Sequence, residues 1–157
     1  MTDVVDKATR SRMMSGIRGK NTTPELYIRQ RLHAKGFRFR LHAKDIPGKP
    51  DIVLPKHKAL VLVHGCFWHG HGCNQCKIPA TNTEFWQAKI VSNQQRDDQN
   101  LRKQKEYGWR TLVIWECAIR ISIQQKASFD LIESIGHWLN SNNSAAYIDI
   151  TGLHSDT

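Results

Sequence analysis

Five side chains that can bind a metal or accept a proton are concentrated between residues 64 and 73. They directly follow the apolar run 59–63. In chain order they are His64, Cys66, His69, His71 and Cys73. Buried strands are short continuous apolar runs of this kind. Because functional groups gather on loops that a rigid scaffold holds, we interpret the stretch as a site at the end of a core strand.

One group of these ligands suits zinc. Thiolates and imidazoles are what Zn²⁺ prefers, and four protein ligands make a structural site. Three of the candidates come from one loop, and the fourth follows a later apolar strand, so that a loop and a strand end would close a tetrahedron. The four are Cys66, His71, Cys73 and Cys117. Cys76 can replace Cys73 or stay free, and ordinary buried thiols are the alternative to a metal site.

A second group suits a hard cation and hydrolysis. Asp51 begins one apolar strand and His64 ends the next, and antiparallel pairing would bring these strand ends together. A carboxylate there suits Mg²⁺, which keeps most of its waters and uses substrate phosphate as a ligand. His69 would take a proton from an attacking water, and Glu25 would orient that water. Taken alone, Asp51 also fits a turn residue after Pro50.

Aromatic side chains surround these ligands. They are Phe67, Trp68, Phe85 and Trp86. Adjacent rings in a loop of glycine and histidine are difficult to bury together, and exposed rings on a basic protein fit stacking against bases or wedging between them. The alternative is that the rings pack over the zinc loop.

The elements that must position these residues follow from periodicity and from capping. Helices are expected from Thr22 to Gly36, from Asn82 to Gly108 and over 129–139. Strands are expected at 37–41, 51–54, 59–63 and 109–115, the second and third of them antiparallel. Strands mixed with helices indicate an α/β fold with a mixed sheet flanked by helices. Residues 140–157 are expected to form a loose tail.

Charge is distributed unevenly along the 157 residues, which we expect to form a single domain. Residues 1–50 hold twelve Lys/Arg against four Asp/Glu, whereas 51–157 hold eleven against ten. A basic half favours a nucleic-acid partner, and the arm 1–21, with Arg10, Arg12 and Lys20, is expected to order on DNA. The alternatives are a solvated tail and a basic surface kept for solubility. With neither a signal peptide nor an apolar span in view, we expect a cytoplasmic protein.

Six motifs resemble the very-short-patch-repair (Vsr) mismatch endonucleases. The resemblance runs from about residue 3 to 120 and continues weakly to 150. The motifs are DKATRS (6–11), PGKPD (47–51), HGCFWH (64–69), PATNTEFW (79–86), GWR (108–110) and WEC (115–117).

The resemblance implies a restriction-endonuclease-like fold with structural zinc. It implies an Mg²⁺-dependent enzyme that nicks one DNA strand 5′ to the thymine of a T·G mismatch, formed by deamination of 5-methylcytosine, and so initiates very short patch repair. Double-stranded DNA with the mismatch is the implied partner of a monomeric protein that acts at the nucleoid, with mismatch-repair scaffold proteins as further candidates.

The resemblance also implies roles for individual residues. Asp51 and the carbonyl of Val63 would bind Mg²⁺, His69 would be the general base, and His64 and Glu25 would assist. The four zinc ligands would be those named above. Phe67, Trp68 and Trp86 would enter the major groove beside the mismatch, with the arm near Met14 in the minor groove.

The sequence departs from the wider nuclease superfamily at one point. Where that superfamily places an acid-x-Lys triplet, this chain has Leu62-Val63-His64, which favours histidine chemistry. Two other functions remain open from the residues alone: a zinc-bearing DNA-binding module without catalysis, and a restriction-type nuclease of the same fold with another target.

Overall fold

The computed structural model describes residues 22–73 and 77–156. The expected basic arm at 1–21, which includes Arg10, Arg12, Met14 and Lys20, lies outside the described residues, and so does Cys76.

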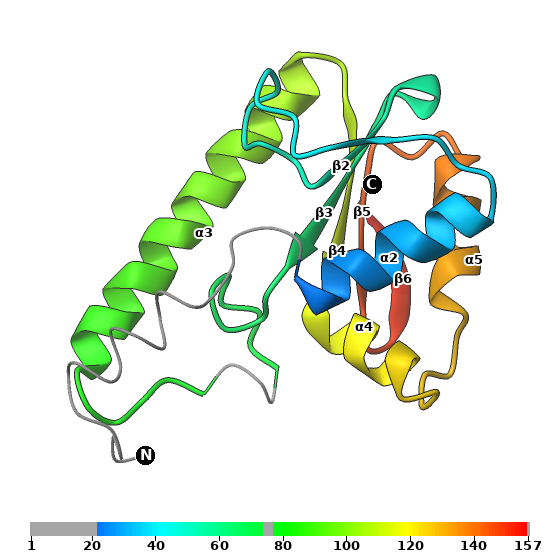
Figure 1. The fold of residues 1–157 in the computed structure, drawn as a ribbon. Helices are drawn as coiled ribbons and strands as arrows, with labels where there is room; N and C mark the ends of the chain where they lie inside the picture. The colour runs from blue at the N-terminus through cyan, green and yellow to red at the C-terminus, as the bar shows by residue number, and fades with distance from the viewer. Residues whose placement is uncertain (1–21, 74–76, 157) are drawn as a thin grey trace.

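A mixed sheet forms the centre of the molecule, with its strands in sequence order (Figure 1). The strands are β1 (Arg40–Leu41), β2 (Ile52–Leu54), β3 (Ala59–His64), β4 (Arg110–Trp115), β5 (Ala145–Asp149) and β6 (Gly152–Asp156). β1, β2 and β3 are antiparallel neighbours, β3, β4 and β5 run parallel, and β6 returns antiparallel to β5. A short 3-10 turn, η1 (Pro55–His57), connects β2 to β3. The expected α/β class and the β2–β3 hairpin are therefore confirmed.

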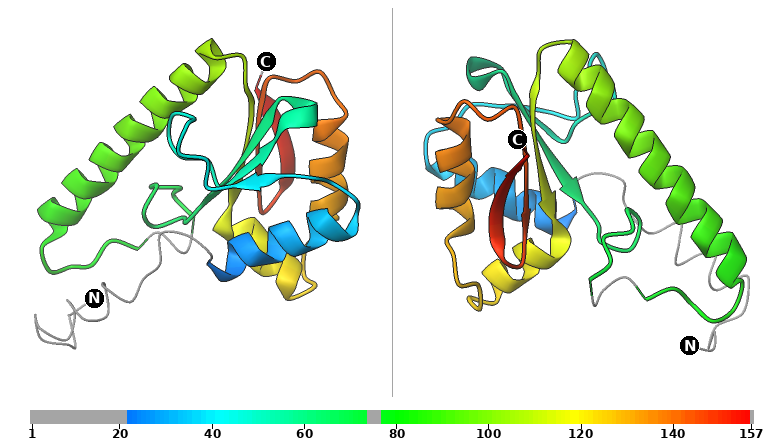
Figure 2. Two further views of the ribbon diagram at one scale, coloured as in Figure 1. Left: turned by 45° about the horizontal axis from the view of Figure 1, so that its top comes forward. Right: turned by 180° about the vertical axis from the view of Figure 1, so that it is seen from behind.

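Helices cover the sheet unequally. They are α2 (Thr23–Ala34), α3 (Thr83–Glu106), α4 (Glu116–Ile123) and α5 (Leu131–Leu139). α2, α4 and α5 lie on one face, and the long α3 crosses the other (Figures 1 and 2). No helix within the described ranges is long and apolar enough to cross a membrane.

The larger core lies under the three shorter helices. Strand side chains alternate between the two faces, and Ile52, Val61 and Ile114 are fully buried against Ile28 and Trp138 from the helices. A smaller apolar cluster lies on the face of the sheet that α3 crosses. It consists of Ala43, Ile46, Val53 and Leu60, with Trp109 against it. The thinner face is the one that carries polar chemistry.

Two sequence-based expectations about elements are wrong. The expected strand at 37–41 shortens to β1, because only Arg40 and Leu41 pair with β2, while Phe37 and Phe39 precede the ladder and pack against the core. The expected loose tail at 140–157 holds β5 and β6, which complete the sheet. β5 alternates half-buried and buried residues, so it is a true core strand although two of its five residues are alanine. The sequence analysis also missed α4, which follows β4 directly.

Candidate active site and metal centre

The ends of β2 and β3 meet as the antiparallel pairing requires. Ile52 is paired with Val61, which places Asp51 beside the end of β3. The backbone N–H of Val63 donates to Oδ2 of Asp51 over 2.8 Å. Val63, whose carbonyl is the second expected metal ligand, therefore lies beside the Asp51 carboxylate at the end of β3. The sequence-based placement of Asp51 beside the end of its neighbouring strand is therefore correct.

The turn that leads into Asp51 is fixed by α3. Gln104 is fully buried, and its Nε2 donates to the carbonyl of Pro47 over 2.7 Å. Gly48 has φ of +82°, and a Cβ at this position would lie 3.0 Å from the Cβ of Asn100. A side chain at residue 48 would therefore both strain the backbone and push the turn away from α3.

Glu25 projects from the first turn of α2 toward Asp51. Its side chain is only 2% exposed, and Nη1 of Arg29 lies 3.0 Å from Oε2. Nε2 of His42 lies 3.1 and 2.9 Å from the two carboxylate oxygens. Possible ligand atoms of Glu25, His42 and Asp51 all lie within 4.8 Å of one another. Two carboxylates and an imidazole therefore converge at one point.

The two histidines expected in catalysis lie together. The rings of His64 and His69 are stacked, with centroids 3.9 Å apart. Nδ1 of His69 lies 2.5 Å from Oδ2 of Asp97 on α3. Because a carboxylate accepts at this contact, the neutral tautomer that fits it carries its proton on Nδ1 and has the lone pair on Nε2.

A cavity of about 370 Å³ joins the metal-binding and proton-accepting groups. Asp51, His64, His69 and Asp97 all line it, and the basic Lys49 and Arg96 contribute to its walls. A phosphate entering this cavity would meet positive charge as well as the groups needed for hydrolysis. Asp51 and His69, which come from different elements, therefore share one cleft.

Burial determines the charge state of two groups in this cleft. It raises the pKa of Asp51 from 3.8 to about 7, the Val63 N–H opposes this, and the nearby Glu25 adds to it. A bound cation would reverse that effect, because it favours the carboxylate form. Burial also lowers the pKa of His64 to about 3, and the adjacent His69 acts in the same direction. His64 is therefore a neutral imidazole at physiological pH.

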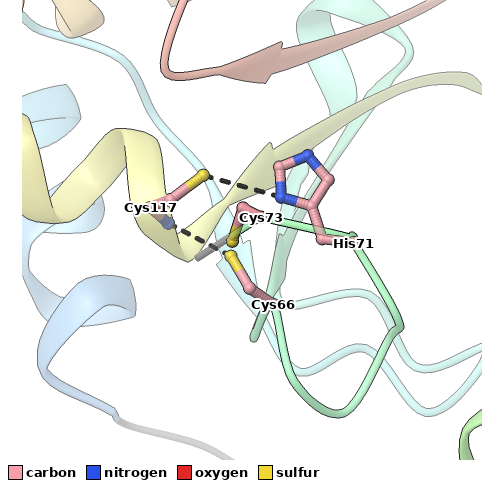
Figure 3. A group of neighbouring side chains, drawn as sticks. All are labelled: Cys66, His71, Cys73 and Cys117. Atoms are coloured by element: carbon pink, nitrogen blue, oxygen red, sulfur yellow. Dashed lines mark hydrogen bonds between the residues drawn. The ribbon is translucent and has the colours of Figure 1, made fainter. Parts of the chain in front are cut away.

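The four expected zinc ligands also lie together. Ligand atoms of Cys66, His71, Cys73 and Cys117 all lie within 4.8 Å of one another (Figure 3). The Cys117 N–H donates to Sγ of Cys66 over 3.3 Å, and Sγ of Cys117 lies 3.6 Å from Nδ1 of His71. In a tetrahedron with Zn–S bonds of about 2.3 Å and Zn–N bonds of about 2.0 Å, two sulfurs lie roughly 3.8 Å apart and a sulfur and a nitrogen roughly 3.5 Å apart, so the contact between Cys117 and His71 fits a zinc ion.

Burial of the thiols supports the same conclusion. It raises the pKa of Cys66 and of Cys117. The thiol of Cys73 adds to both shifts, whereas the hydrogen bond with Cys66 opposes the rise in the pKa of Cys117. Buried thiols that resist ionisation become thiolates when a metal binds. His71 is held in place by stacking on Trp115, with ring centroids 4.0 Å apart. The cluster is therefore a possible Cys/His metal site with a preset geometry.

The aromatic residues form a cluster of their own. Phe67, Trp68 and Trp86 are half-buried, and their rings meet edge to face with centroids between 5.2 and 6.0 Å apart. Phe85 packs on Trp86 and is 61% exposed. The mutual contacts fit the packing alternative, whereas the partial exposure leaves ring surface for a ligand. Entry into a DNA groove stays a prediction.

The sequence analysis missed what α3 and the β1–β2 connection add to the site. The polar middle of α3 supplies three contacts to the site. Asp97 binds His69, Asn93 Nδ2 donates to the carbonyl of Trp68 over 2.9 Å, and Gln94 Nε2 donates to that of Gly70 over 3.2 Å. The one available signal was three amide or acid side chains recurring at helical spacing. His42 gave no signal, because its spacing from Glu25 has no periodicity.

Several known proteins are similar in sequence to this chain over most of its length. The family described as "DNA mismatch endonuclease Vsr" matches residues 2–75. DNA mismatch endonuclease Vsr of Escherichia coli (strain K12) is 40% identical over 154 residues, which cover 98% of each chain. Type II nicking enzyme V.XorIIP of Xanthomonas oryzae pv. oryzae is 44% identical over 76% of this chain and 88% of that protein. Type II nicking enzyme V.NmeAIP of Neisseria meningitidis is 45% identical over 76% and 86%.

The resemblance inferred from the six motifs is confirmed by these matches. The chain is 40% identical to the E. coli endonuclease over nearly its full length, and its cleft holds a carboxylate and a histidine–aspartate pair. Together these observations identify an enzyme. The chain belongs to the Vsr family of DNA mismatch endonucleases and is an endonuclease.

Proposed function

We propose that this endonuclease nicks one strand of duplex DNA 5′ to the thymine of a T·G mismatch, in an Mg²⁺-dependent reaction that initiates very short patch repair. The observation that carries the hydrolytic part is the single cleft shared by Asp51 and His69. The mismatch part is supported by the printed name of the E. coli relative, and the nicking part by those of the two type II nicking enzymes.

In the proposed mechanism Mg²⁺ is held by Asp51 and the carbonyl of Val63. When bound, the ion makes the phosphate more electrophilic and stabilises the leaving oxyanion. His69 takes the proton of the attacking water at Nε2, while Asp97 holds the Nδ1 proton and thereby the ring orientation. Glu25 positions an ordered water beside Asp51.

His64 has a more limited part in this mechanism. It is neutral at physiological pH because burial lowers its pKa to about 3. It therefore cannot supply positive charge to the phosphate. It packs flat against His69 and donates a single N–H, which fits a contact to a phosphate oxygen.

The Cys/His cluster is proposed to bind one structural zinc ion. The ligands would be Cys66, His71, Cys73 and Cys117, because these four converge. The ion would tie the loop 64–73 to the start of α4. That loop also carries His64 and His69, so zinc would indirectly hold the catalytic histidines in position.

DNA recognition is proposed to use the aromatic cluster and the N-terminal arm. Phe67, Trp68 and Trp86 would enter the major groove at the mismatch. A T·G pair is easier to unstack than a matched pair, so wedging rings would favour that site. The arm, through Met14 and its basic neighbours Arg10, Arg12 and Lys20, would approach the minor groove. We also propose a restriction-endonuclease-like fold, which is supported by the position of Asp51 at a strand end of the mixed sheet.

A strand-nicking assay over a panel of duplexes tests this proposal. The protein is incubated with Mg²⁺ and duplexes that contain T·G, other mismatches or only matched pairs, each strand carrying its own label. We expect a nick only on the thymine strand of the T·G duplex, and no nick with Asp51→Ala. Asp45→Ala, which changes an exposed aspartate six residues away, is the control and should retain full activity.

Two results would contradict the proposal in different ways. Equal cleavage of matched and mismatched duplexes would favour a restriction-type nuclease with another target. Unchanged cleavage by Asp51→Ala would overturn the Mg²⁺ assignment.

A further inference from the structure

His42 connects the two acidic residues of the cleft. Its side chain contacts both oxygens of Glu25, at 3.1 and 2.9 Å from Nε2. Its backbone N–H donates to the carbonyl of Asp51 over 3.1 Å. One residue therefore fixes a side chain from α2 relative to the first residue before β2.

The backbone of His42 is held in an unfavourable conformation. Its φ is +47°, in the left-handed region that only a few per cent of residues other than glycine adopt, although asparagine, aspartate and histidine do so more often than the rest. The residue directly follows β1, where Leu41 is still paired with Ile52. Such strain persists only where the surroundings determine it, and it is concentrated at functional sites. Here the chain turns so that the imidazole reaches Glu25.

The carboxylate of Glu25 needs partners because it is almost fully buried. An ionised carboxylate away from water is costly unless it is paired and hydrogen-bonded. Among the described residues, Arg29 supplies a partner from the next turn of α2, and His42 supplies a partner from outside the helix. The contact from His42 comes from the same connection that leads to Asp51, so it aligns the two carboxylates with each other as well as compensating for burial.

We propose that His42 is a positioning residue that holds Glu25 beside Asp51, so that Glu25 supports the divalent cation of Asp51 and the Val63 carbonyl through an ordered water. This inference rests on the proposed function, because it concerns the same cation. His42 donates through Nε2 and does not bind the ion itself: Mg²⁺ takes oxygen ligands, and imidazole suits Zn²⁺, Cu²⁺ and Ni²⁺.

Two substitutions separate the side chain from the backbone. His42→Gly removes the imidazole and relieves the positive φ, so the variant is expected to fold. His42→Gln retains an N–H donor at the same distance from the backbone as Nε2. His33→Gln is the matched control, because His33 is an exposed histidine of α2.

The test measures binding of Mn²⁺ alone to the full chain without DNA, by electron paramagnetic resonance, and the Mg²⁺ concentration for half-maximal nicking. We expect His42→Gly to weaken Mn²⁺ binding by about 10- to 100-fold, the usual effect of losing a residue that orients metal ligands. His42→Gln should recover most of this affinity, and His33→Gln should equal the parent. DNA affinity without metal should not change in any variant.

Three outcomes would decide against the inference. Unchanged Mn²⁺ affinity in His42→Gly would show that Glu25 needs no help from His42. Failure of His42→Gln to recover affinity, with a changed preference between Mn²⁺ and Mg²⁺, would make His42 a direct ligand instead. If Asp51→Asn itself retained Mn²⁺ binding, the proposed function would fail at its metal site. Loss in Asp51→Asn with no loss in His42→Gly would overturn only the inference.

Discussion

Two clusters of polar side chains, the cleft and the Cys/His cluster, both take residues from the loop 64–73 but suit different metal ions. The proposed catalytic cleft presents carboxylates and imidazoles to a cavity of about 370 Å³. The Cys/His cluster buries Cys66 and Cys117 at 0% and 3% exposure. An open set of oxygen ligands suits a hard cation that must also meet substrate, whereas a closed set of thiolates suits an ion that only holds structure.

The loop 64–73 contributes to both clusters at once. His64 and His69 face the cleft, while Cys66, His71 and Cys73 face the start of α4. Residues that would hold the structure and residues that would act on the substrate therefore alternate within one short loop. If this is correct, damage to the Cys/His cluster should destroy both fold and activity, and damage to the cleft should remove activity without destabilising the fold.

The largest expected effect is loss of the cluster. Cys117→Ser should reduce bound zinc from about one per chain to near zero, measured by atomic absorption. It should lower the free energy of unfolding by more than about 3 kcal/mol, because structural zinc contributes on the order of 10 kcal/mol to folding. Nicking should be lost as a consequence. Asp51→Ala should retain the zinc and should be no less stable to heat than the parent. Normal zinc content in Cys117→Ser would remove the contrast between the two clusters.

Next in size is loss of the proton acceptor. His69→Ala should lower kcat for nicking by about 10²- to 10⁴-fold, the usual contribution of general-base catalysis. The zinc content and the unfolding temperature should stay close to those of the parent, although His69 lies between two zinc ligands in sequence. A large loss of stability would show that the cleft and the cluster are not separable in this loop.

A smaller effect is expected for the partner of this histidine. Asp97→Asn keeps the size of the side chain but no longer favours the Nδ1 proton of His69, so kcat should fall by about 10- to 100-fold with little change in KM. Asp98→Asn is the matched control, because the neighbouring aspartate is exposed. Equal activity in the two variants would assign the His69–Asp97 contact to structure alone.

The smallest expected effect is a pH dependence of stability. The raised pKa of Asp51, about 7 against 3.8, means that the folded protein keeps a proton that the unfolded chain has released between these values. The free energy of unfolding should therefore fall as pH rises through this window. Asp51→Asn lacks this loss, so its advantage in unfolding temperature without metal should grow from pH 5 to pH 8.

The pH dependence can be checked by thermal unfolding in a chelating buffer and with Mg²⁺. Added Mg²⁺ should raise the stability of the parent at pH 8 and not that of Asp51→Asn. A parent protein equally stable relative to Asp51→Asn at both pH values would show that the carboxylate is ionised throughout.

Local patterns were sufficient wherever a residue and its structural consequence are close in sequence. The Thr22 cap and Pro24 specified the start of α2, and the apolar runs specified β2, β3 and β4. Local patterns were insufficient for β5, because alanine is uncommon in strands and Ala145 and Ala146 are held in the sheet by their pairing with β4. Propensity is a weak guide where tertiary pairing decides.

The sequence by itself determined the kinds of chemistry and named most of the candidate ligands. Thiols, imidazoles and a carboxylate at strand ends have fixed preferences for metals and protons, and the motifs carried the family. Only the tertiary structure decided which groups work together. Asp97 reaches His69 across 28 positions, and His42 reaches Glu25 across 17. Such contacts have no periodicity in the chain, because they arise when the sheet brings α2, the β1–β2 connection and α3 to one edge.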